Sequence, residues 1–257
     1  MEEIENNVTV NDSENIMLDI EHVSKKYLNS NRYSLQDLTL KIKEGELFGF
    51  LGQNGAGKST TIKCLTGIHP FDEGDIKING FSIKTQPLKA KASFGYVPDN
   101  HSVYENLTGR EYVNCIADLY GVPKEERDSR LDEYLKMFKL GFAVDRQIKG
   151  YSHGMKQKIC IIAALIHEPR LWVLDEPMVG LDPQSIFAII DKMKEHCAKG
   201  NTVFFSSHNI DLVAKICDRA AIIHNGKLCE VVDLSDPANR ENLETVFRSY
   251  TMEENEG

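Results

Sequence analysis

The sequence predicts an α/β fold with a parallel-sheet core, an antiparallel β subdomain and an inserted helical subdomain. Three observations lead to this prediction. Short apolar runs alternate with helical patterns after residue 170, which is typical of parallel strands joined by crossover helices. Alternating strand patterns near the N-terminus indicate a separate β layer. Helical signals dominate between these two parts, from about residue 87 to residue 167.

The N-terminal β layer is predicted from residues 17–20 and 38–42, where apolar and polar residues alternate. Glu44-Gly45 then provides a turn. The next apolar run, residues 47–51, ends in a glycine-rich loop, and a helical pattern follows at residues 58–65. This order predicts a strand, a loop and a helix.

Two helices are predicted inside the insertion. Thr108 and Glu111 have the spacing of a capping box, and the helix that they begin should end near Gly121. A second helix is predicted over residues 125–139, where the apolar side chains recur on one helical face.

The rest of the chain alternates between strand and helix patterns. The predicted order is strand 171–174, helix from Pro183, strand 202–205, helix from about Ile210 and strand 220–223. Asn225-Gly226 is a strong turn signal, so residues 227–231 are expected to form a hairpin with the preceding strand.

Length and charge favour one folded domain. The chain has 257 residues, 41% of them hydrophobic and 27% charged, which suits a single globular unit. The net charge of −9 arises mainly at the ends, where residues 1–16 and 252–257 contain eight acidic residues and no basic one. We therefore expect an acidic disordered leader (1–16), a nearly neutral domain (17–251) and an acidic tail (252–257). No nucleic-acid partner is expected from this balance.

The cysteines and apolar runs restrict the cellular location. The six cysteines are scattered, with no metal-ligand spacing, so we expect reduced thiols. The N-terminus lacks the pattern of a signal peptide, and the longest apolar run, residues 159–166, is far shorter than the roughly 20 residues of a spanning helix. A cytoplasmic chain is expected.

The glycine-rich loop matches the phosphate-binding pattern G-x-x-x-x-G-K-[ST]. Glycines let successive backbone N–H groups point at phosphate oxygens, and the following helix adds its positive end. Lys58 is predicted to neutralise the β- and γ-phosphates, and Ser59 to bind Mg²⁺. The predicted nucleotide contacts are Gly52, Gln53, Asn54, Gly55, Ala56, Gly57, Lys58, Ser59 and Thr60.

Two carboxylates, Asp175 and Glu176, follow the apolar strand 171–174. The carboxyl ends of parallel strands share one edge of a sheet, so these side chains should face the phosphate loop. Asp175 is predicted to hold Mg²⁺ through water, and Glu176 to act as general base or to orient the attacking water. These residues predict a P-loop NTPase that hydrolyses ATP or GTP.

Further motifs narrow this class. Tyr151-Ser152-His153-Gly154-Met155-Lys156-Gln157-Lys158 resembles the signature of ABC ATPases. Asp175-Glu176-Pro177 and Gly180-Leu181-Asp182-Pro183 resemble their Walker B motif and D-loop, and Ser207-His208 follows a later strand as it does in that family. The order of motifs is also the family's, and the resemblance covers residues 18–231.

The resemblance implies a single ABC-type ATPase domain that dimerises with a second copy or a paralogous ATPase subunit. Each of two Mg²⁺-bound ATP molecules would lie between the phosphate loop of one copy and Ser152 and Gly154 of the other. His208 is similar to the family's switch histidine, which contacts the γ-phosphate. Tyr27 is similar to the aromatic residue that stacks on adenine.

The sequence departs from the family pattern at two places. Asp99 stands where most members have Gln, and its carboxylate is expected to touch Mg²⁺ or water. His153 and Met155 replace the usual Gly and Gln of the signature, while Ser152 and Gly154 remain in position to contact phosphate.

The residues of the signature and residues 242–247 resemble those of the bacterial-type exporter branch that handles antibiotics and peptides. This resemblance implies separate transmembrane permease subunits, contacted near residues 99–105, and a peripheral place on the inner face of the membrane. Two alternatives stay open. One is a soluble ABC ATPase outside transport, although the chain shows one domain and no sustained heptads. The other is a weakly hydrolysing, nucleotide-gated regulatory subunit, which Asp99 and the altered signature favour.

Overall fold

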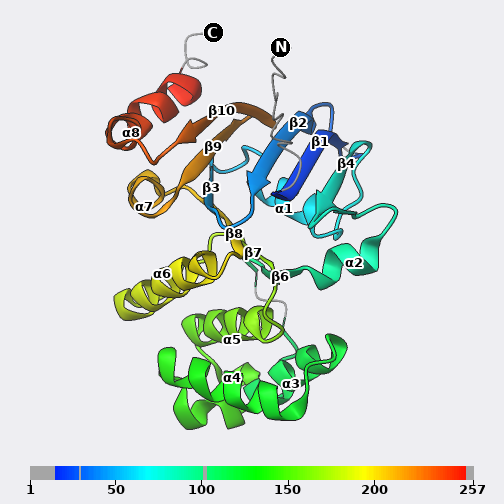
Figure 1. Cartoon of the computed structure of the whole chain (residues 1–257), viewed down its shortest axis with the longest axis vertical. Coiled ribbons are helices and arrows are strands. Elements are labelled where there is room, and N and C mark those ends of the chain that lie inside the picture. Colours follow the sequence, from blue (N-terminus) through cyan, green and yellow to red (C-terminus); the bar gives the residue numbers. More distant parts are fainter. Residues whose placement is uncertain (1–14, 29, 101–102, 253–257) are drawn as a thin grey trace, which may run out of the picture.

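A computed structural model describes residues 15–28, 30–100 and 103–252 of the chain (Figure 1). Most of the predicted acidic leader, residues 1–14, and most of the acidic tail, residues 253–257, lie outside the described residues. The described residues form a four-stranded sheet, a six-stranded sheet and several helices.

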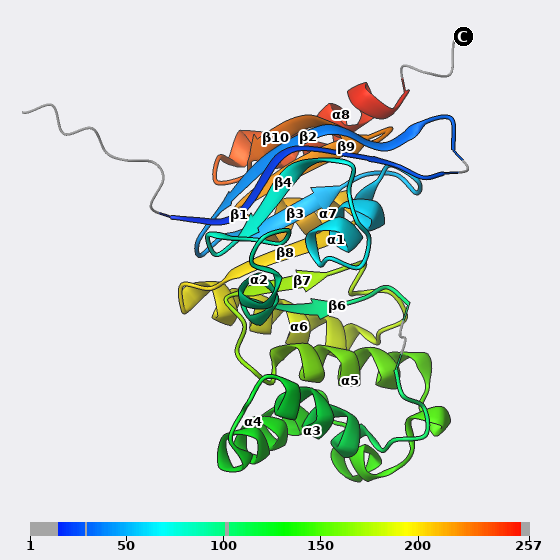
Figure 2. The same ribbon diagram turned by 90° about the vertical axis from the view of Figure 1, so that its right-hand side faces the viewer.

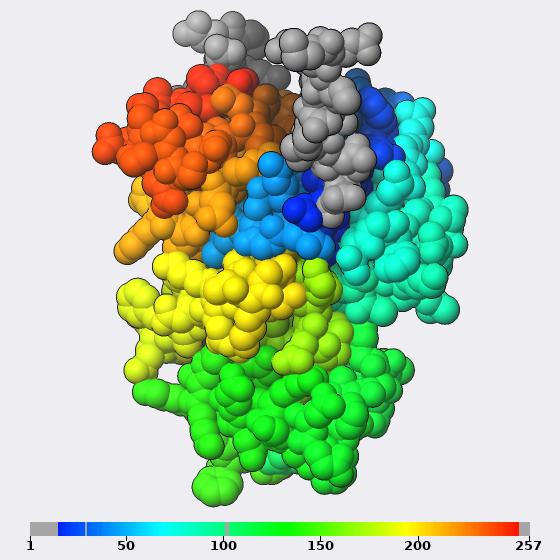
Figure 3. All heavy atoms as spheres, viewed as in Figure 1, coloured from blue at the N-terminus to red at the C-terminus, as the bar shows by residue number. Residues whose placement is uncertain are grey.

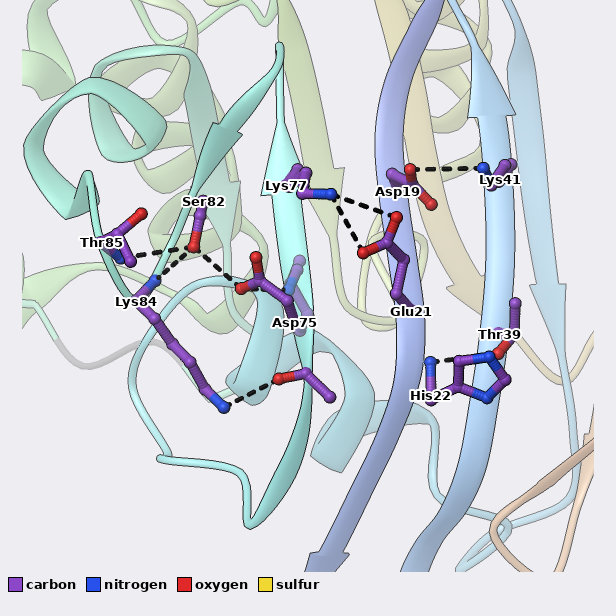
Figure 4. A network of polar contacts seen from close by, with 12 residues as sticks. Asp19, Glu21, His22, Thr39, Lys41, Asp75, Lys77, Ser82, Lys84 and Thr85 are labelled. Atoms are coloured by element: carbon purple, nitrogen blue, oxygen red, sulfur yellow. Dashed lines mark hydrogen bonds and ion pairs between the residues drawn. The ribbon is translucent and has the colours of Figure 1, made fainter. Parts of the chain in front are cut away.

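The N-terminal part forms an antiparallel sheet with strand order β2-β1-β4-β5. Its strands are β1 (Ile16–Lys26), β2 (Tyr33–Lys43), β4 (Glu73–Ile78) and β5 (Phe81–Ser82). Apolar and polar residues alternate along β2, so one face is buried and the other is exposed. The polar face carries cross-strand ion pairs, with Lys77 Nζ 3.0 Å from Glu21 Oε2 and Lys41 Nζ 3.5 Å from Asp19 Oδ2 (Figure 4).

The core sheet has six strands in the order β10-β9-β3-β8-β7-β6. They are β3 (Leu47–Leu51), β6 (Phe94–Val97), β7 (Leu171–Leu174), β8 (Thr202–Ser207), β9 (Arg219–His224) and β10 (Lys227–Asp233). All neighbouring strands pair in parallel except β9 and β10, which form the hairpin predicted at Asn225-Gly226. The carboxyl ends of β3, β7 and β8 therefore meet at one edge.

Both faces of the core sheet are buried, each in its own apolar core. Along β7, Trp172 and Leu174 face the helices, while Val173 faces the antiparallel sheet. Along β8, Phe205 likewise faces the helices and Phe204 faces the antiparallel sheet. Because both faces are buried, alternate side chains are apolar on each side, and these strands appear in the sequence as continuous apolar runs.

The described part also contains eight α-helices and two 3₁₀ helices. They are α1 (Lys58–Leu65), α2 (Pro87–Ala92), α3 (Gly109–Leu119), α4 (Lys124–Met137), η1 (Gly141–Asp145), η2 (Ile148–Gly150), α5 (His153–Leu165), α6 (Pro183–Ala198), α7 (Ile210–Ile216) and α8 (Pro237–Met252). Helices α3, α4 and α5 lie together at the end of the molecule opposite the antiparallel sheet (Figure 2). In the space-filling view, α6 lies between this helical end and the strands (Figure 3).

The helical part agrees with the predicted helices and differs at its start. The capping box is present: Thr108 Oγ1 accepts from the Glu111 N–H at 3.1 Å, and Glu111 Oε2 accepts from the Thr108 N–H at 2.8 Å. Within the segment predicted as an insertion, β6 pairs in parallel with β7 and so belongs to the core sheet. The separate group of helices starts after β6, because residues 94–97 are too apolar to stay outside the sheet.

Candidate nucleotide-binding site

Residues 52–57 form a loop between β3 and α1. Gly55 and Gly57 have φ angles of 83° and 113°, which other residues rarely adopt. A methyl group on Gly57 would also lie 2.8 Å from the carbonyl oxygen of Ser34. The loop therefore requires glycine at residue 57 both for its backbone angle and for its contact with the preceding β2 strand.

Lys58 begins α1 and its side chain turns back over the loop. Its Nζ donates to the carbonyl oxygens of Gly52 at 2.7 Å and Gln53 at 3.2 Å. The side chain is only 6% exposed, so its charge lies in a partly desolvated position. A cation held in this way is placed to meet phosphate oxygens at the positive end of a helix.

Asp175 and Glu176 follow β7 at the same edge. Ser206, on the neighbouring strand β8, joins them: its hydroxyl donates to Asp175 Oδ1 at 2.7 Å and accepts from the Glu176 N–H at 3.0 Å. Glu176 has a positive φ of 48°, which turns the chain away from the strand directly after the carboxylate. The parallel pairing of β7 with β8 fixes both acids.

The Glu176 carboxylate lies between two nitrogen atoms. Lys58 Nζ is 3.5 Å from Oε1, and His208 Nδ1 is 3.0 Å from Oε2. The contact with Lys58 is close enough for an ion pair but does not have hydrogen-bond geometry, and within the described part of the chain Oε1 is buried without a hydrogen-bond partner. A buried acceptor of this kind is a place where a water molecule can bind.

Two cavities adjoin this cluster. The first, of about 220 Å³, is lined by Ser34, Gln53, Asn54, Gly55, Gly57, Lys58, Ser59, Thr60, Asp99 and Glu176. The second, of about 320 Å³, shares Ser59 and Asp99 with the first and is also lined by Asp175 and Tyr96. Burial, and then the charges of Asp175 and Asp99, raise the pKa of Tyr96 above its ordinary range. The carboxylates that follow β6 and β7, Asp99 and Asp175, thus both face the second cavity.

The donors at this junction fit a magnesium ion better than a metal held by protein alone. The hydroxyl of Ser59 and the carboxylates of Asp99 and Asp175 line one cavity. Across the described residues, no group of three or more His, Cys, Asp or Glu side chains is arranged to hold a metal. Mg²⁺ prefers oxygen ligands and commonly completes its shell with water and substrate phosphates. A few oxygen donors beside a phosphate loop match that preference.

Other predicted contacts lie away from these cavities. Ser152 is exposed and caps α5, where its Oγ accepts from the Met155 N–H at 3.3 Å. Neither Ser152 nor Gly154 lines the two cavities. Tyr27 lies just after β1, with its ring edge-on to His69 at 5.7 Å between centroids, and it does not line them either. The chain brings together the loop, both acids, Asp99 and His208.

Sequence reasoning missed two contributors to the site. Ser206 holds both acids through the contacts described above. Ser34, in β2, lines the first cavity and supports the loop at Gly57. The polar Ser206-Ser207 pair at the end of an otherwise apolar strand was the available signal for the first. For Ser34 the sequence holds no signal, because its contact depends on how the two sheets meet.

Comparisons with known proteins agree with this geometry. Residues 35–179 match the family model described as ABC transporter. The linearmycin resistance ATP-binding protein LnrL of Bacillus subtilis (strain 168) is 36% identical over 232 residues, which cover 90% of this chain and 74% of that protein.

Two solved structures are similar over most of their length. An ATP-binding subunit of an ABC transporter has a TM-score of 0.82 and 34% identity, covering 90% of this chain and 94% of the other. A dimeric ATP-binding cassette in a post-hydrolysis state with ADP and Pi has a TM-score of 0.77 and 25% identity, covering 85% of this chain and 99% of the other. The resemblance in the motifs is confirmed: the chain belongs to the ABC transporter family, as an ATP-binding and ATP-hydrolysing subunit.

Proposed function

We propose that this subunit closes as a dimer around two Mg²⁺-bound ATP molecules and drives export through separate permease subunits. The observation that carries the proposal is the meeting of Lys58 and Glu176, 3.5 Å apart, beside a cavity lined by the phosphate loop. A cation for the phosphates and a carboxylate for the attacking water are the two groups that hydrolysis of the terminal phosphate requires.

The residues of this chain divide the reaction between them. The loop N–H groups and Lys58 bind the phosphates and balance the charge of the transferring group. Glu176 orients a water molecule for attack on the γ-phosphorus and takes up its proton, while the bond to the β-phosphate oxygen breaks. His208, 3.0 Å from Glu176, holds that carboxylate and contacts the γ-phosphate. The products are ADP and inorganic phosphate.

Mg²⁺ would be held by Ser59, with Asp175 and Asp99 acting directly or through water. When bound, it neutralises phosphate charge during the reaction. Asp175 is 2% exposed, accepts from Ser206 through Oδ1 and lines the second cavity together with Ser59 and Asp99. We propose Asp99 as a further oxygen donor on the same side, in the place of the usual amide.

The dimer is supported by the exposed start of α5. Ser152 and Gly154 lie at a helix N-terminus, a common place for phosphate binding, yet they do not line the chain's own cavities. The similar cassette with ADP and Pi is a dimer. In the proposed arrangement these residues close the ATP site of the facing copy, which is either identical or a paralogous subunit. Tyr27 is proposed to stack on adenine.

Separate permeases are supported by the family and by one surface. Among residues 15–28, 30–100 and 103–252, no helix is long and apolar enough to cross a membrane. A cavity of about 260 Å³ opens between β6 and helices α3 and α5, with Tyr112, Tyr120 and Phe94 among its lining. We propose that this cleft, with the predicted contact region 99–105, receives the permease on the inner face of the membrane. Residues 101–102 of that region lie outside the described residues.

The name of the relative LnrL refers to linearmycin resistance. Together with the exporter-like signature, this supports an antibiotic, peptide or related small molecule as the exported substrate. The permease, not this chain, would select it.

Phosphate release by the purified chain tests the proposed function. We expect ATP hydrolysis that depends on Mg²⁺, and Glu176→Gln should lower kcat at least about 100-fold while ATP binding persists, because the amide cannot take up a proton. Glu241→Gln, at an exposed position on α8, is the matched control and should leave kcat unchanged. Normal hydrolysis by Glu176→Gln would remove that residue from the mechanism.

The transport assignment needs a second measurement. Hydrolysis should be stimulated several-fold when the chain is reconstituted with the membrane subunits encoded beside it. Unchanged activity with those subunits would favour the non-transport ATPase, and negligible activity in both conditions would favour the regulatory subunit.

A further inference from the structure

The first turn of α5 packs against the segment that follows Glu176. His153 covers Gly180, which has a φ of 76°. A methyl group on Gly180 would lie 2.3 Å from Cδ2 and 2.8 Å from Nε2 of the His153 ring. The imidazole therefore fills the space that a side chain at position 180 would need. Gly154 is also close, since a methyl group there would lie 3.1 Å from the Gly180 carbonyl oxygen.

Two polar contacts extend this packing along the helix. Gln157, which is 2% exposed, donates from Nε2 to the carbonyl oxygen of Pro177 at 2.9 Å. Lys158 Nζ lies 3.1 Å from Oδ1 of Asp182, the residue that caps α6. Positions 153, 154, 157 and 158 share one helical face. This face contacts the turn of residues 177–182 near both of its ends.

The turn has weak internal support. Its two backbone hydrogen bonds are long. The backbone nitrogen of Val179 lies 3.3 Å from the backbone carbonyl oxygen of Glu176, and that of Leu181 lies 3.4 Å from the backbone carbonyl oxygen of Met178. Gly180 adds a flexible backbone position. The contacts from α5 therefore set the shape of the turn.

Glu176 stands at the start of this turn, so the shape of the turn reaches the reacting carboxylate. On the strand side, the backbone of Glu176 is fixed by the bond from its N–H to Ser206 Oγ. On the other side the chain leaves at a positive φ of 48° and enters the turn directly. The hydrogen bond to Ser206 holds only the N–H of Glu176. A shift of the turn would therefore reorient the rest of this residue and move its carboxylate relative to Lys58.

We propose that His153 is a positioning residue for ATP hydrolysis: its ring fixes the turn of residues 177–182 against α5 and so holds Glu176 in place. The inference rests on the proposed function, in which Ser152 serves the ATP of the facing copy while Glu176 serves its own. His153 follows Ser152 directly and packs on the turn of Glu176. Contact of α5 with one ATP is thereby transmitted, within the same chain, to the carboxylate that acts on the other.

A double-mutant cycle on kcat tests the contact between His153 and Gly180. We expect His153→Ala to lower kcat about tenfold, with the KM for ATP changed by less than about twofold, because binding groups stay in place. Gly180→Ala should lower kcat about 100-fold in the parent chain, where its methyl group meets the ring. In the His153→Ala background the same change should cost only about tenfold, since the clash with the ring is gone while the strain of a side chain at a φ of 76° remains.

His153→Gln is the conservative variant, because its flat amide occupies much of the same space, and it should keep kcat within about threefold of the parent. His22→Ala is the matched control and should leave kcat unchanged. It removes an exposed histidine on β1 that pairs with Asp37. Thermal unfolding checks that each variant is folded at the assay temperature. Unchanged kcat in His153→Ala, or additive effects in the cycle, would overturn this inference alone. A parent chain without any hydrolysis would instead overturn the proposed function.

Discussion

At the scale of single residues, Lys58 has the clearest electrostatic role. Its ammonium group is held over the loop by two carbonyl oxygens and lies 3.5 Å from a carboxylate oxygen of Glu176. Nothing else in the first cavity carries positive charge, as far as the described residues go. We therefore propose that the phosphates of ATP depend on this side chain and on backbone N–H groups.

Lys58→Ala should weaken ATP binding by roughly 10- to 100-fold, because a charge-assisted contact is worth about 1.5–3 kcal/mol. Isothermal titration calorimetry with ATP and Mg²⁺ measures the change. Lys199→Ala, directly after α6, removes an equal charge from an exposed pair with Glu195 and is the control. An unchanged affinity in Lys58→Ala would contradict the placement of the phosphates at this loop.

His196 makes stability depend on pH. Burial lowers its pKa to about 4, and its ring lies edge-on to Trp172 at 6.0 Å. In the unfolded chain the pKa of histidine is about 6.5, so between these values the unfolded state binds more protons. The free energy of unfolding should fall as the pH drops from about 6.5 to 4, by an amount on the order of 1–3 kcal/mol.

Urea unfolding at pH 7 and pH 5 tests this expectation. His196→Phe should reduce the difference between the two pH values, but only in part, because burial also lowers the pKa of His167 to about 4. His22→Gln, at an exposed position, should leave the difference unchanged. An equal pH dependence in parent and His196→Phe would show that His196 is not buried in its neutral form.

At the scale of secondary-structure elements, the end of α7 depends on an arginine from α8. Arg240 donates from Nη1 to the carbonyl oxygens of Ala214 at 2.9 Å and Lys215 at 3.2 Å, and from Nη2 to that of Cys217 at 3.3 Å. Its Nε also contacts the Leu234 oxygen. The last carbonyl groups of a helix have no hydrogen-bond donor within the helix. Here one guanidinium group donates to several carbonyl groups at the end of α7.

Arg240→Met should lower the free energy of unfolding by about 2 kcal/mol, measured by urea titration, because several partly buried acceptors lose their donor. Arg240→Lys should recover only a part, since an ammonium group cannot match the fork of a guanidinium. Arg248→Met on the same helix removes an exposed pair with Glu244 and should cost less than about 0.5 kcal/mol. Equal effects at both positions would refute the role of Arg240.

Elements with a local signal were predictable, and elements formed by distant pairing were not. Thr108 and Glu111, which lie within four residues of each other, predict the start of α3. The apolar run 171–174 predicts β7 at its observed bounds. In contrast, β4 begins Glu-Gly-Asp, a poor strand sequence, and is ordered by pairing with β1. The edge strand β6 lies in the segment predicted as the helical insertion, because its membership of the core sheet depends on β7, more than 70 positions later.

At the scale of the whole molecule, the site follows from one rule of parallel sheets. The phosphate loop, Asp175 and Ser206 come from three strands whose order in the sheet differs from their order in the chain. The rule that strand carboxyl ends share an edge predicted the meeting of the loop with Asp175 and Glu176. It could not reveal Ser34, which arrives from the other sheet.

The proposed division of each ATP site between two copies leads to a complementation experiment. A chain with Lys58→Ala has a defective loop but an intact Ser152, and a chain with Ser152→Ala has the reverse. Each variant alone builds two defective sites, so each should hydrolyse ATP very slowly. In a mixed dimer, one site combines the intact loop of the Ser152→Ala chain with the intact Ser152 of the other, while the second site collects both defects.

Mixing the two variants in equal amounts should therefore restore hydrolysis, up to roughly a quarter of the parent rate, since about half of the dimers are mixed and each has one complete site. Phosphate release from the mixture, compared with the sum of the separate variants, measures the effect. A mixture of Lys58→Ala with Glu176→Gln is the control: both defects lie on the loop side of a site, so no mixed dimer has a complete one. Restoration in the first mixture and not in the second requires Ser152 to act on the ATP of the facing chain, and equal rates in both mixtures would exclude it.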